Sequence, residues 1–312
     1  MRAALILIGG LLLGAAQPLL AEKLPPVRSE QTDSRLKVEI LDITPRFLAF
    51  YEAARNAPDA TARFALWTEH YGFAAVPPGP RGEAMARQLL EQGWPRYAAA
   101  LPMIRRGAAL FGTEPIETLR AVTRLLEADG EVTIRLTAYV GAFDDNAFSA
   151  GGAIAFPVEM APELRRLIMA HEFTHAVHMR LAGLSGGWER SIAETIVQEG
   201  LAVHVARELT PGRTMAQYIE HRPGWWDSVS ARRAAVLRGL VPVLASKDGE
   251  TVFRFTVGQG TTGSEREAYA AGWWVVEQLR RQGMSLAQIA RIPESEMAGL
   301  VERTINRMLE GN

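Results

Sequence analysis

Two histidines four residues apart, His171 and His175, enclose a glutamate in the segment His-Glu-Phe-Thr-His at residues 171–175. On a helix, residues i and i+4 share a face, so both imidazoles can reach one metal ion, while Glu172 lies one step round the helix. Zinc accepts neutral imidazole nitrogen, and a catalytic zinc takes three protein ligands and leaves one position for water. The segment therefore predicts a Zn²⁺ cofactor and metal-assisted hydrolysis, with Glu172 placed to act on the attacking water.

The rest of this segment favours a buried site over two surface histidines. A surface helix would carry more charge than the flanking residues do, because most of them are apolar. Imidazoles in such a helix need partners, and coordination to a metal would offset the cost of burying them. The apolar neighbours are Leu164, Leu167, Ile168, Ala170, Phe173, Ala176 and Val177.

A third ligand must be a histidine or a carboxylate, because the chain has no cysteine. Glu194 and Glu199 are the candidates, and on one helix their side chains point about 140° apart, so only one can face the metal. The residues one turn from Glu199 are mostly apolar, whereas those beside Glu194 are more polar, which favours Glu199. We also expect Gly200 to let this helix pack closely on the histidine helix.

These motifs, His171-Glu172-xx-His175 followed by Glu199-Gly200-Leu201-Ala202, resemble those of the gluzincin metallopeptidases. The later segments 267–274 and 283–286 are similar to the C-terminal helices of predicted bacterial Zn-dependent proteases, so the resemblance covers roughly residues 130 to 310. It implies a zincin-like fold and a zinc-dependent peptidase acting on a peptide or protein substrate. It further implies that His171, His175 and Glu199 are the zinc ligands and that Glu172 is the general base. The two candidates for the third ligand differ in their distance along the chain from His175. Glu199 follows it after 23 intervening residues, whereas Glu194 follows it after 18.

The elements around these motifs predict an α+β fold that is mostly helical, with a small sheet before the histidine helix. Apolar residues at helical spacing predict helices at 46–55, 60–70, 82–92 and 114–128. Strands are predicted at 131–140, where apolar and polar residues alternate, and at 151–158. Further helices are expected at 162–183, 188–209, from a capping box at Ser264 to Gly283, and at 293–310. Residues 22–37, with Pro25-Pro26, are expected to form an extended lead-in.

The first 21 residues have the character of a secretory signal, with one charge at Arg2 and an apolar run of about 14 residues that is too short to span a membrane. We therefore expect a signal peptide at 1–21, a helical N-terminal region at 22–129 and a metallopeptidase domain at 130–312. The expected location is the periplasm or the exterior of the cell, with no stable membrane anchor after cleavage. With a formal net charge of −1, nucleic acid is an unexpected partner.

Several other residues are considered as secondary candidates for the site or its surroundings. Tyr269 or Arg266 could supply a donor to the oxyanion of the tetrahedral intermediate. His178 is interpreted as a packing residue or a support for the ligands, and His204 is expected to face elsewhere. The strand at 151–156 could be a sheet edge that pairs with an extended substrate, or an ordinary sheet edge. The Trp225-Trp226 and Trp273-Trp274 pairs are expected in the core or the wall of a cleft.

Two other functions fit the same residues. One is a non-catalytic protein that binds a peptide or partner in the periplasm on a zincin scaffold, although such a role does not require Glu172. The other is metal-assisted hydrolysis of a non-peptide amide, such as a cell-wall component. Endopeptidase action is preferred slightly, because the sequence shows no acidic signature for capturing a free amino terminus.

Overall fold

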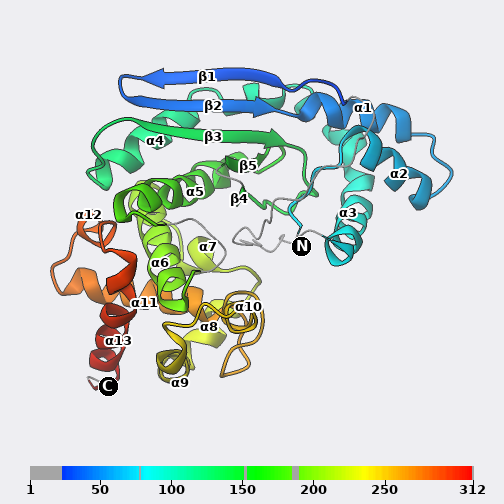
Figure 1. Cartoon of the computed structure of the whole chain (residues 1–312). Helices are drawn as coiled ribbons and strands as arrows, with labels where there is room; N and C mark the ends of the chain where they lie inside the picture. The colour runs from blue at the N-terminus through cyan, green and yellow to red at the C-terminus, as the bar shows by residue number, and fades with distance from the viewer. Residues whose placement is uncertain (1–22, 77–78, 151–152, 185–189, 311–312) are drawn as a thin grey trace. The chain divides into compact units, whose positions relative to one another are not determined.

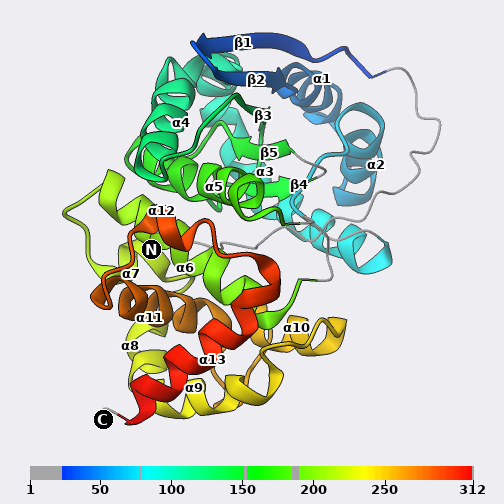
Figure 2. The ribbon, with the colours of Figure 1, turned by 60° about the vertical axis from the view of Figure 1, so that its left-hand side comes forward.

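The computed structural model describes residues 23–76, 79–150, 153–184 and 190–310, in two compact units. Unit 1 comprises Met1–Glu117 and Glu131–Arg165, and unit 2 comprises Thr118–Gly130 and Arg166–Asn312. Unit 1 contains a five-stranded mixed sheet, and unit 2 is built mainly of helices (Figures 1 and 2). The expected α+β class is confirmed. The signal peptide expected at 1–21 lies outside the described residues.

The sheet of unit 1 has the strand order β1-β2-β3-β5-β4. Its strands are β1 (Val27–Asp33), β2 (Leu36–Asp42), β3 (Val132–Tyr139), β4 (Phe148–Ala150) and β5 (Ala153–Pro157). The β1–β2 and β4–β5 pairs are antiparallel, whereas β3 is parallel to both β2 and β5. Alternate β3 residues are buried, as the sequence alternation predicted.

Four helices follow β2 along the chain, each overlapping a helix that the sequence predicted, and a 3₁₀ turn that was not predicted follows the third. They are α1 (Thr44–Ala54), α2 (Ala60–His70), α3 (Pro80–Ile104), η1 (Gly107–Phe111) and α4 (Glu114–Leu125). Aromatic rings join the first three: Phe47 contacts Tyr71 and Tyr97 edge to face. The Tyr71 hydroxyl donates to Val140 O and accepts from Val140 N, which ties this cluster to the residue after β3.

Two expectations for this region are wrong. The extended lead-in at 22–37 instead contains β1 and the start of β2, which form a hairpin. The helix expected at 82–92 does not end there, because α3 continues through Gly93-Trp94-Pro95 and Pro102 to Ile104. Gly93 is needed for packing at this point, since a Cβ there would lie 2.3 Å from the Tyr97 hydroxyl.

The strand before the histidine helix is an interior strand, which corrects the expectation of a sheet edge at 151–156. Ile154 pairs with Leu136 of β3 on one side and with Ser149 of β4 on the other. A substrate therefore cannot add to β5, because both of its backbone edges are already paired. Gly151 and Gly152 lie outside the described residues.

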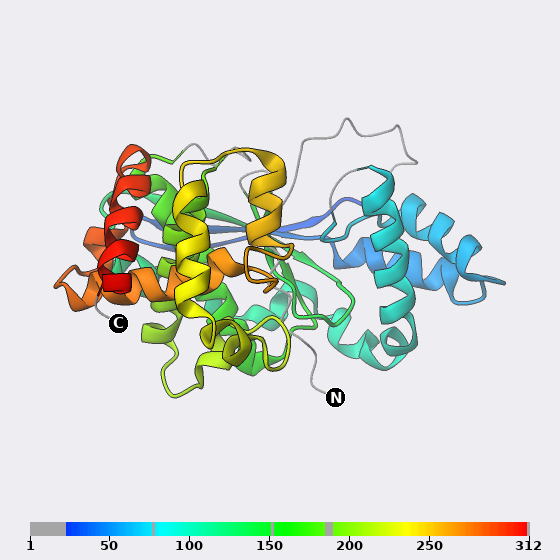
Figure 3. The same ribbon diagram turned by 90° about the horizontal axis from the view of Figure 1, so that it is seen from below.

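Two helices carry the chemistry expected from the sequence. Helix α5 (Pro162–Ala182) begins in unit 1 and continues into unit 2, and α6 (Ile192–Leu209) belongs to unit 2. The remaining elements are α7 (Met215–Ile219), α8 (Trp225–Ser230), α9 (Arg233–Leu240), η2 (Val241–Val243), α10 (Gly249–Thr256), α11 (Glu267–Arg281), α12 (Leu286–Ile289) and α13 (Glu294–Glu310). Helices α9, α11 and α13 pack against one another in unit 2 (Figure 3). Among the described residues, no helix has the length and apolar character needed to cross a membrane.

Helix α6 is the centre of unit 2, with every residue from Ile192 to Ala206 buried. Its buried N-terminus is satisfied locally: Ser191 Oγ accepts from Glu194 N, and the Ile192 and Ala193 amides donate to Ser246 O and Leu244 O. The first amides of a helix have no carbonyl partner within the helix, so these three hydrogen bonds satisfy them and fix the start of α6.

The close contact expected between Gly200 and the histidine helix is made with α11 instead. A Cβ on Gly200 would lie 2.2 Å from Gly272 O, and a Cβ on Gly272 would lie 2.7 Å from Ile196 O. The two glycines thus let the α6 and α11 backbones meet directly. The capping box expected at Ser264 is also absent, because α11 begins after Arg266, which has φ of 55° and no side-chain cap.

Candidate metal centre

The two histidines of α5 turn their Nε2 atoms toward one point. The nitrogens of His171 and His175 lie 3.1 Å apart, and the rings meet edge to face with centroids 4.8 Å apart. This is the i, i+4 arrangement that the sequence predicted, on one face of a continuous helix.

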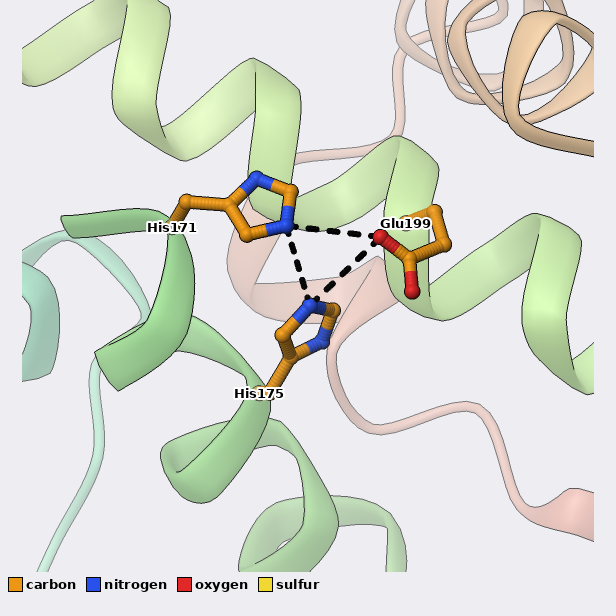
Figure 4. Close-up of side chains that lie close together, drawn as sticks. All are labelled: His171, His175 and Glu199. Carbon is orange, nitrogen blue, oxygen red and sulfur yellow. Dashed lines mark hydrogen bonds and ion pairs between the residues drawn. The ribbon is translucent and has the colours of Figure 1, made fainter. Parts of the chain in front are cut away.

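Glu199 of α6 completes a triangle with these two nitrogens (Figure 4). Its Oε2 lies 3.3 Å from His171 Nε2 and 3.6 Å from His175 Nε2. Four ligands about 2.0–2.1 Å from a tetrahedral zinc ion would be separated from one another by about 3.3–3.4 Å. The three distances in this site, 3.1, 3.3 and 3.6 Å, therefore match three corners of a zinc tetrahedron.

The donor set and its burial also fit a divalent cation. His171 and Glu199 are each 2% exposed, whereas the His175 side chain is 12% exposed. Burial opposes charge on Glu199, but the His175 and His171 imidazoles outweigh it and hold the pKa of this carboxyl well below its usual range. Two imidazole nitrogens and an ionised carboxylate oxygen are the ligands that zinc takes in hydrolytic sites.

Glu194, the alternative third ligand, is not part of this triangle. Its Oε1 accepts a hydrogen bond of 2.7 Å from Gln198 Nε2, and its Oε2 has no hydrogen-bond partner among the described residues. Burial is the main cause that raises the pKa of Glu194. The structure therefore brings Glu199, and not Glu194, to the histidine pair, as the position of Glu199 on the helix suggested.

Arg190 is a neighbour of the site that sequence reasoning missed. Its Nη2 lies 3.8 Å from Glu199 Oε1, and its Nη1 donates to Gln198 Oε1 at 3.3 Å. The guanidinium thus faces the carboxylate oxygen that the histidines leave free. The signal available in the sequence was a cation directly before Ser191, the N-cap of the helix that carries Glu199.

Glu172 is buried beside the triangle, at 5% exposure. Burial disfavours a charged His175 imidazole, yet the carboxylates of Glu199 and Glu172 outweigh this effect and raise the pKa of His175. The negative charge of Glu172 therefore stabilises a positive charge on His175, as expected for a residue that lies one step round the helix from His171 and His175.

Tyr269 and Arg266, the candidate oxyanion donors, lie together at the start of α11. The Arg266 guanidinium lies 3.9 Å from the centroid of the Tyr269 ring. Burial raises the pKa of Tyr269, and the negative charge of Glu199 raises it further. The phenol of Tyr269 therefore stays protonated. Arg266 Nη2 is buried without a hydrogen-bond partner among the described residues.

The other histidines of these helices do not join the triangle. His178 is fully buried, neither ring nitrogen has a hydrogen-bond partner among the described residues, and burial with the charge of His175 lowers its pKa to about 3. His204 stacks on Trp273 with centroids 3.9 Å apart, and burial lowers its pKa to about 4. His204 thus faces α11, as expected, and both imidazoles are neutral near pH 7.

Comparison with known proteins supports a zinc-dependent chemistry. Residues 147–298, just under half of the chain, match the model of a family described as "Predicted Zn-dependent protease (DUF2268)". This segment includes His171 and His175 of α5, all of α6 and all of α11. Searches of curated proteins and of solved structures found no match.

Proposed function

We propose that this chain is a zinc-dependent peptidase of the gluzincin type with a zincin-like fold. The observation that carries the proposal is the triangle of His171, His175 and Glu199, whose sides have the lengths of tetrahedral zinc edges. The family description, which names a zinc-dependent protease, agrees with it. His171, His175 and Glu199 would hold the ion, and the more exposed side beside His175 would admit water and substrate.

The chain's own groups supply the proton transfers. A zinc ion held by His171, His175 and Glu199 would act as a Lewis acid toward the scissile carbonyl and would lower the pKa of water. Glu172 takes the proton of the attacking water and passes it to the leaving amine, which requires an ionised carboxylate close to the ligands. Tyr269, protonated and under the influence of the Glu199 charge, is the better of the two candidate donors to the oxyanion.

The proposed substrate class, domain bounds and location are those that the sequence predicts. The substrate is a peptide or protein, with endopeptidase action preferred, and nucleic acid is not a partner. The peptidase domain is 130–312, preceded by the N-terminal region 22–129. Residues 1–21 would direct export and be removed, which would place the enzyme in the periplasm or outside the cell.

The test is the variant Glu172→Gln, compared with wild type and with Glu296→Gln, which removes an exposed carboxylate of α13. General acid–base groups contribute roughly 10²–10⁴-fold to rate, so Glu172→Gln should lose at least about a hundredfold in turnover. Zinc content, measured by mass spectrometry, should stay near one ion per chain in all three proteins.

The substrates should be unfolded proteins, peptides and muropeptides. Full turnover in Glu172→Gln would contradict the assigned base, and a wild type that binds no supplied zinc would contradict the whole proposal. Cleavage of muropeptides alone would identify a cell-wall amidase instead of a peptidase. Peptide binding without cleavage, unchanged in Glu172→Gln, would identify a binding protein.

A further inference from the structure

A cavity of about 260 Å³ lies in unit 2 among helices α6, α7, α9 and α11. None of its lining residues belongs to the candidate metal centre. Its walls carry three arginines and a single glutamate, together with the rings of two tryptophans. The charged residues are Arg207, Arg233, Arg281 and Glu277, and the rings are those of Trp273 and Trp274.

The positive charge of this cavity exceeds what its own carboxylate can neutralise. Glu277 Oε1 pairs with Arg281 Nη2 at 3.2 Å. Within the described part of the chain, the side chains of Arg207 and Arg233 make no ion pair or hydrogen bond, and each instead lies over a tryptophan ring. Two guanidiniums therefore face the cavity without a negative partner, and such groups are the preferred ligands of carboxylate and phosphate oxygens.

Arg233 is the most constrained of these cations. Its Nε is buried without a hydrogen-bond partner among the described residues, and its guanidinium lies 5.6 Å from the centroid of the Trp274 ring. Burial, followed by repulsion from Arg281, lowers the pKa of Arg233. A like charge nearby costs free energy, and an anion between the two guanidiniums would relieve this cost.

The tryptophans hold the cations in place and give the cavity an apolar wall. Arg207 lies 5.2 Å from the centroid of Trp273, whose ring is itself fixed by stacking on His204. Trp273 and Trp274 are 7% and 6% exposed, so neither ring is free to turn away. A larger cavity of about 940 Å³ also has Arg207, Glu277 and Arg281 among its lining residues, so the two cavities are neighbours.

We propose that the pocket lined by Arg207, Arg233 and Arg281 binds a small oxyanion, a phosphate or carboxylate group, against the rings of Trp273 and Trp274. The guanidiniums supply charge-assisted hydrogen bonds, and the rings accept the apolar part of an ester or an aryl acid. This site is separate from the proposed hydrolytic site and does not depend on it.

The test measures binding of inorganic phosphate and of phenyl phosphate to wild type by calorimetry at constant ionic strength, with thermal unfolding as a second readout. Arg233→Gln removes the charge of the unpaired guanidinium. Arg238→Gln is the matched control, because Arg238 lies exposed on the same helix and lines neither cavity. Loss of one charge-assisted hydrogen-bond donor should weaken binding roughly ten- to hundredfold in Arg233→Gln only.

The outcomes separate the sources of the anion and the possible places of binding. Tighter binding of phenyl phosphate than of inorganic phosphate would indicate an aryl ester, equal binding would indicate a free anion, and both support the pocket. Phosphate held by a metal at the histidine site would bind Arg233→Gln as well as wild type, which would overturn the proposal. It would also be overturned if neither probe bound wild type, or if both arginine variants weakened binding equally.

Discussion

Arg190 and Glu199 face each other beside the histidine pair, with Nη2 of the arginine 3.8 Å from Oε1 of the glutamate. The other oxygen of Glu199, Oε2, is the atom that meets both imidazoles. The arginine is therefore placed to hold Oε1 and to leave Oε2 turned toward the candidate metal position. Arg190 is a positioning residue for this carboxylate, and it has no contact with the histidines among the described hydrogen bonds and ion pairs.

Replacement of Arg190 by methionine should weaken zinc binding by roughly 10- to 100-fold, the usual effect of removing a group that orients a metal ligand. Competition with a zinc-sensitive dye would measure the affinity. Arg190→Lys should recover part of the loss, because it restores the charge but not the fork of the guanidinium. Equal zinc affinity in wild type and Arg190→Met would show that Glu199 is oriented without the arginine.

The two candidate carboxylates of α6 should differ sharply in zinc content. Glu199→Ala should lose the ion, because it removes one corner of the triangle, whereas Glu194→Ala should retain about one zinc per chain. Mass spectrometry of the purified proteins gives both values. Circular dichroism should show that both variants remain folded, and loss of zinc only in Glu194→Ala would move the third ligand to that residue.

The contact between α6 and α11 should tolerate no side chain. Alanine in place of glycine normally stabilises a helix interior by about 1 kcal/mol. At Gly272 the added Cβ would lie 2.7 Å from Ile196 O, a backbone atom that cannot move alone, so Gly272→Ala should destabilise unit 2 by about 1–3 kcal/mol. Urea unfolding measures the change.

Gly249→Ala is the control, since a Cβ at Gly249 in α10 meets nothing within 4 Å. This variant should be neutral or slightly more stable. A Gly272→Ala protein as stable as Gly249→Ala would mean that the helices can separate at little cost.

Glu159 should give unit 1 a pH-dependent stability. Burial raises the pKa of Glu159 to about 8, although its Oε1 accepts hydrogen bonds from Gly141 N and Phe143 N. A folded pKa above the unfolded value means that the folded state holds the proton more tightly. The stabilising contribution of Glu159 is therefore complete below about pH 4.5 and is lost progressively as the pH rises to about 8.

Glu159→Gln should flatten the decline in unfolding free energy between pH 5 and pH 8, by an amount on the order of a few kcal/mol. Denaturant unfolding at several pH values measures it. Glu131→Gln, which alters an exposed carboxylate of the same unit, should keep the wild-type slope. A parallel decline in wild type and Glu159→Gln would assign the pH dependence to other groups.

The helices that carry the site were predictable because each has a strong local pattern. Pro162 and Glu163 open α5 and Gly183 follows it, and the long buried run of α6 begins at a serine N-cap. Strands β1 and β2 were missed because β1 is polar and exposed along most of its length. The partner that makes β2 an interior strand is β3, about ninety residues later, and no local pattern indicates such a pairing.

Within the site, helical spacing was enough to select His171 and His175, whereas the choice of Glu199 over Glu194 rested on its apolar neighbours and on the Glu199-Gly200-Leu201-Ala202 resemblance. Helical spacing was not enough to find Arg190, because that contact depends on how the chain enters α6. Gly200 was correctly singled out as a position of close packing but was assigned to the wrong neighbour. A missing side chain permits a close approach, and the tertiary fold determines which helix makes it.

Strand β1 lies exposed at one edge of the sheet, where the strand of a second chain could in principle be added. It pairs only with β2 among the described strands, so one row of its backbone amides and carbonyls is unpaired by any other strand. Its charges, including Glu30 paired to Lys37 at 2.7 Å, would have to be desolvated or brought close to like charges if a second chain added there. This strand is thereby protected against edge-to-edge aggregation, and replacing its polar residues with valine or isoleucine would remove that protection.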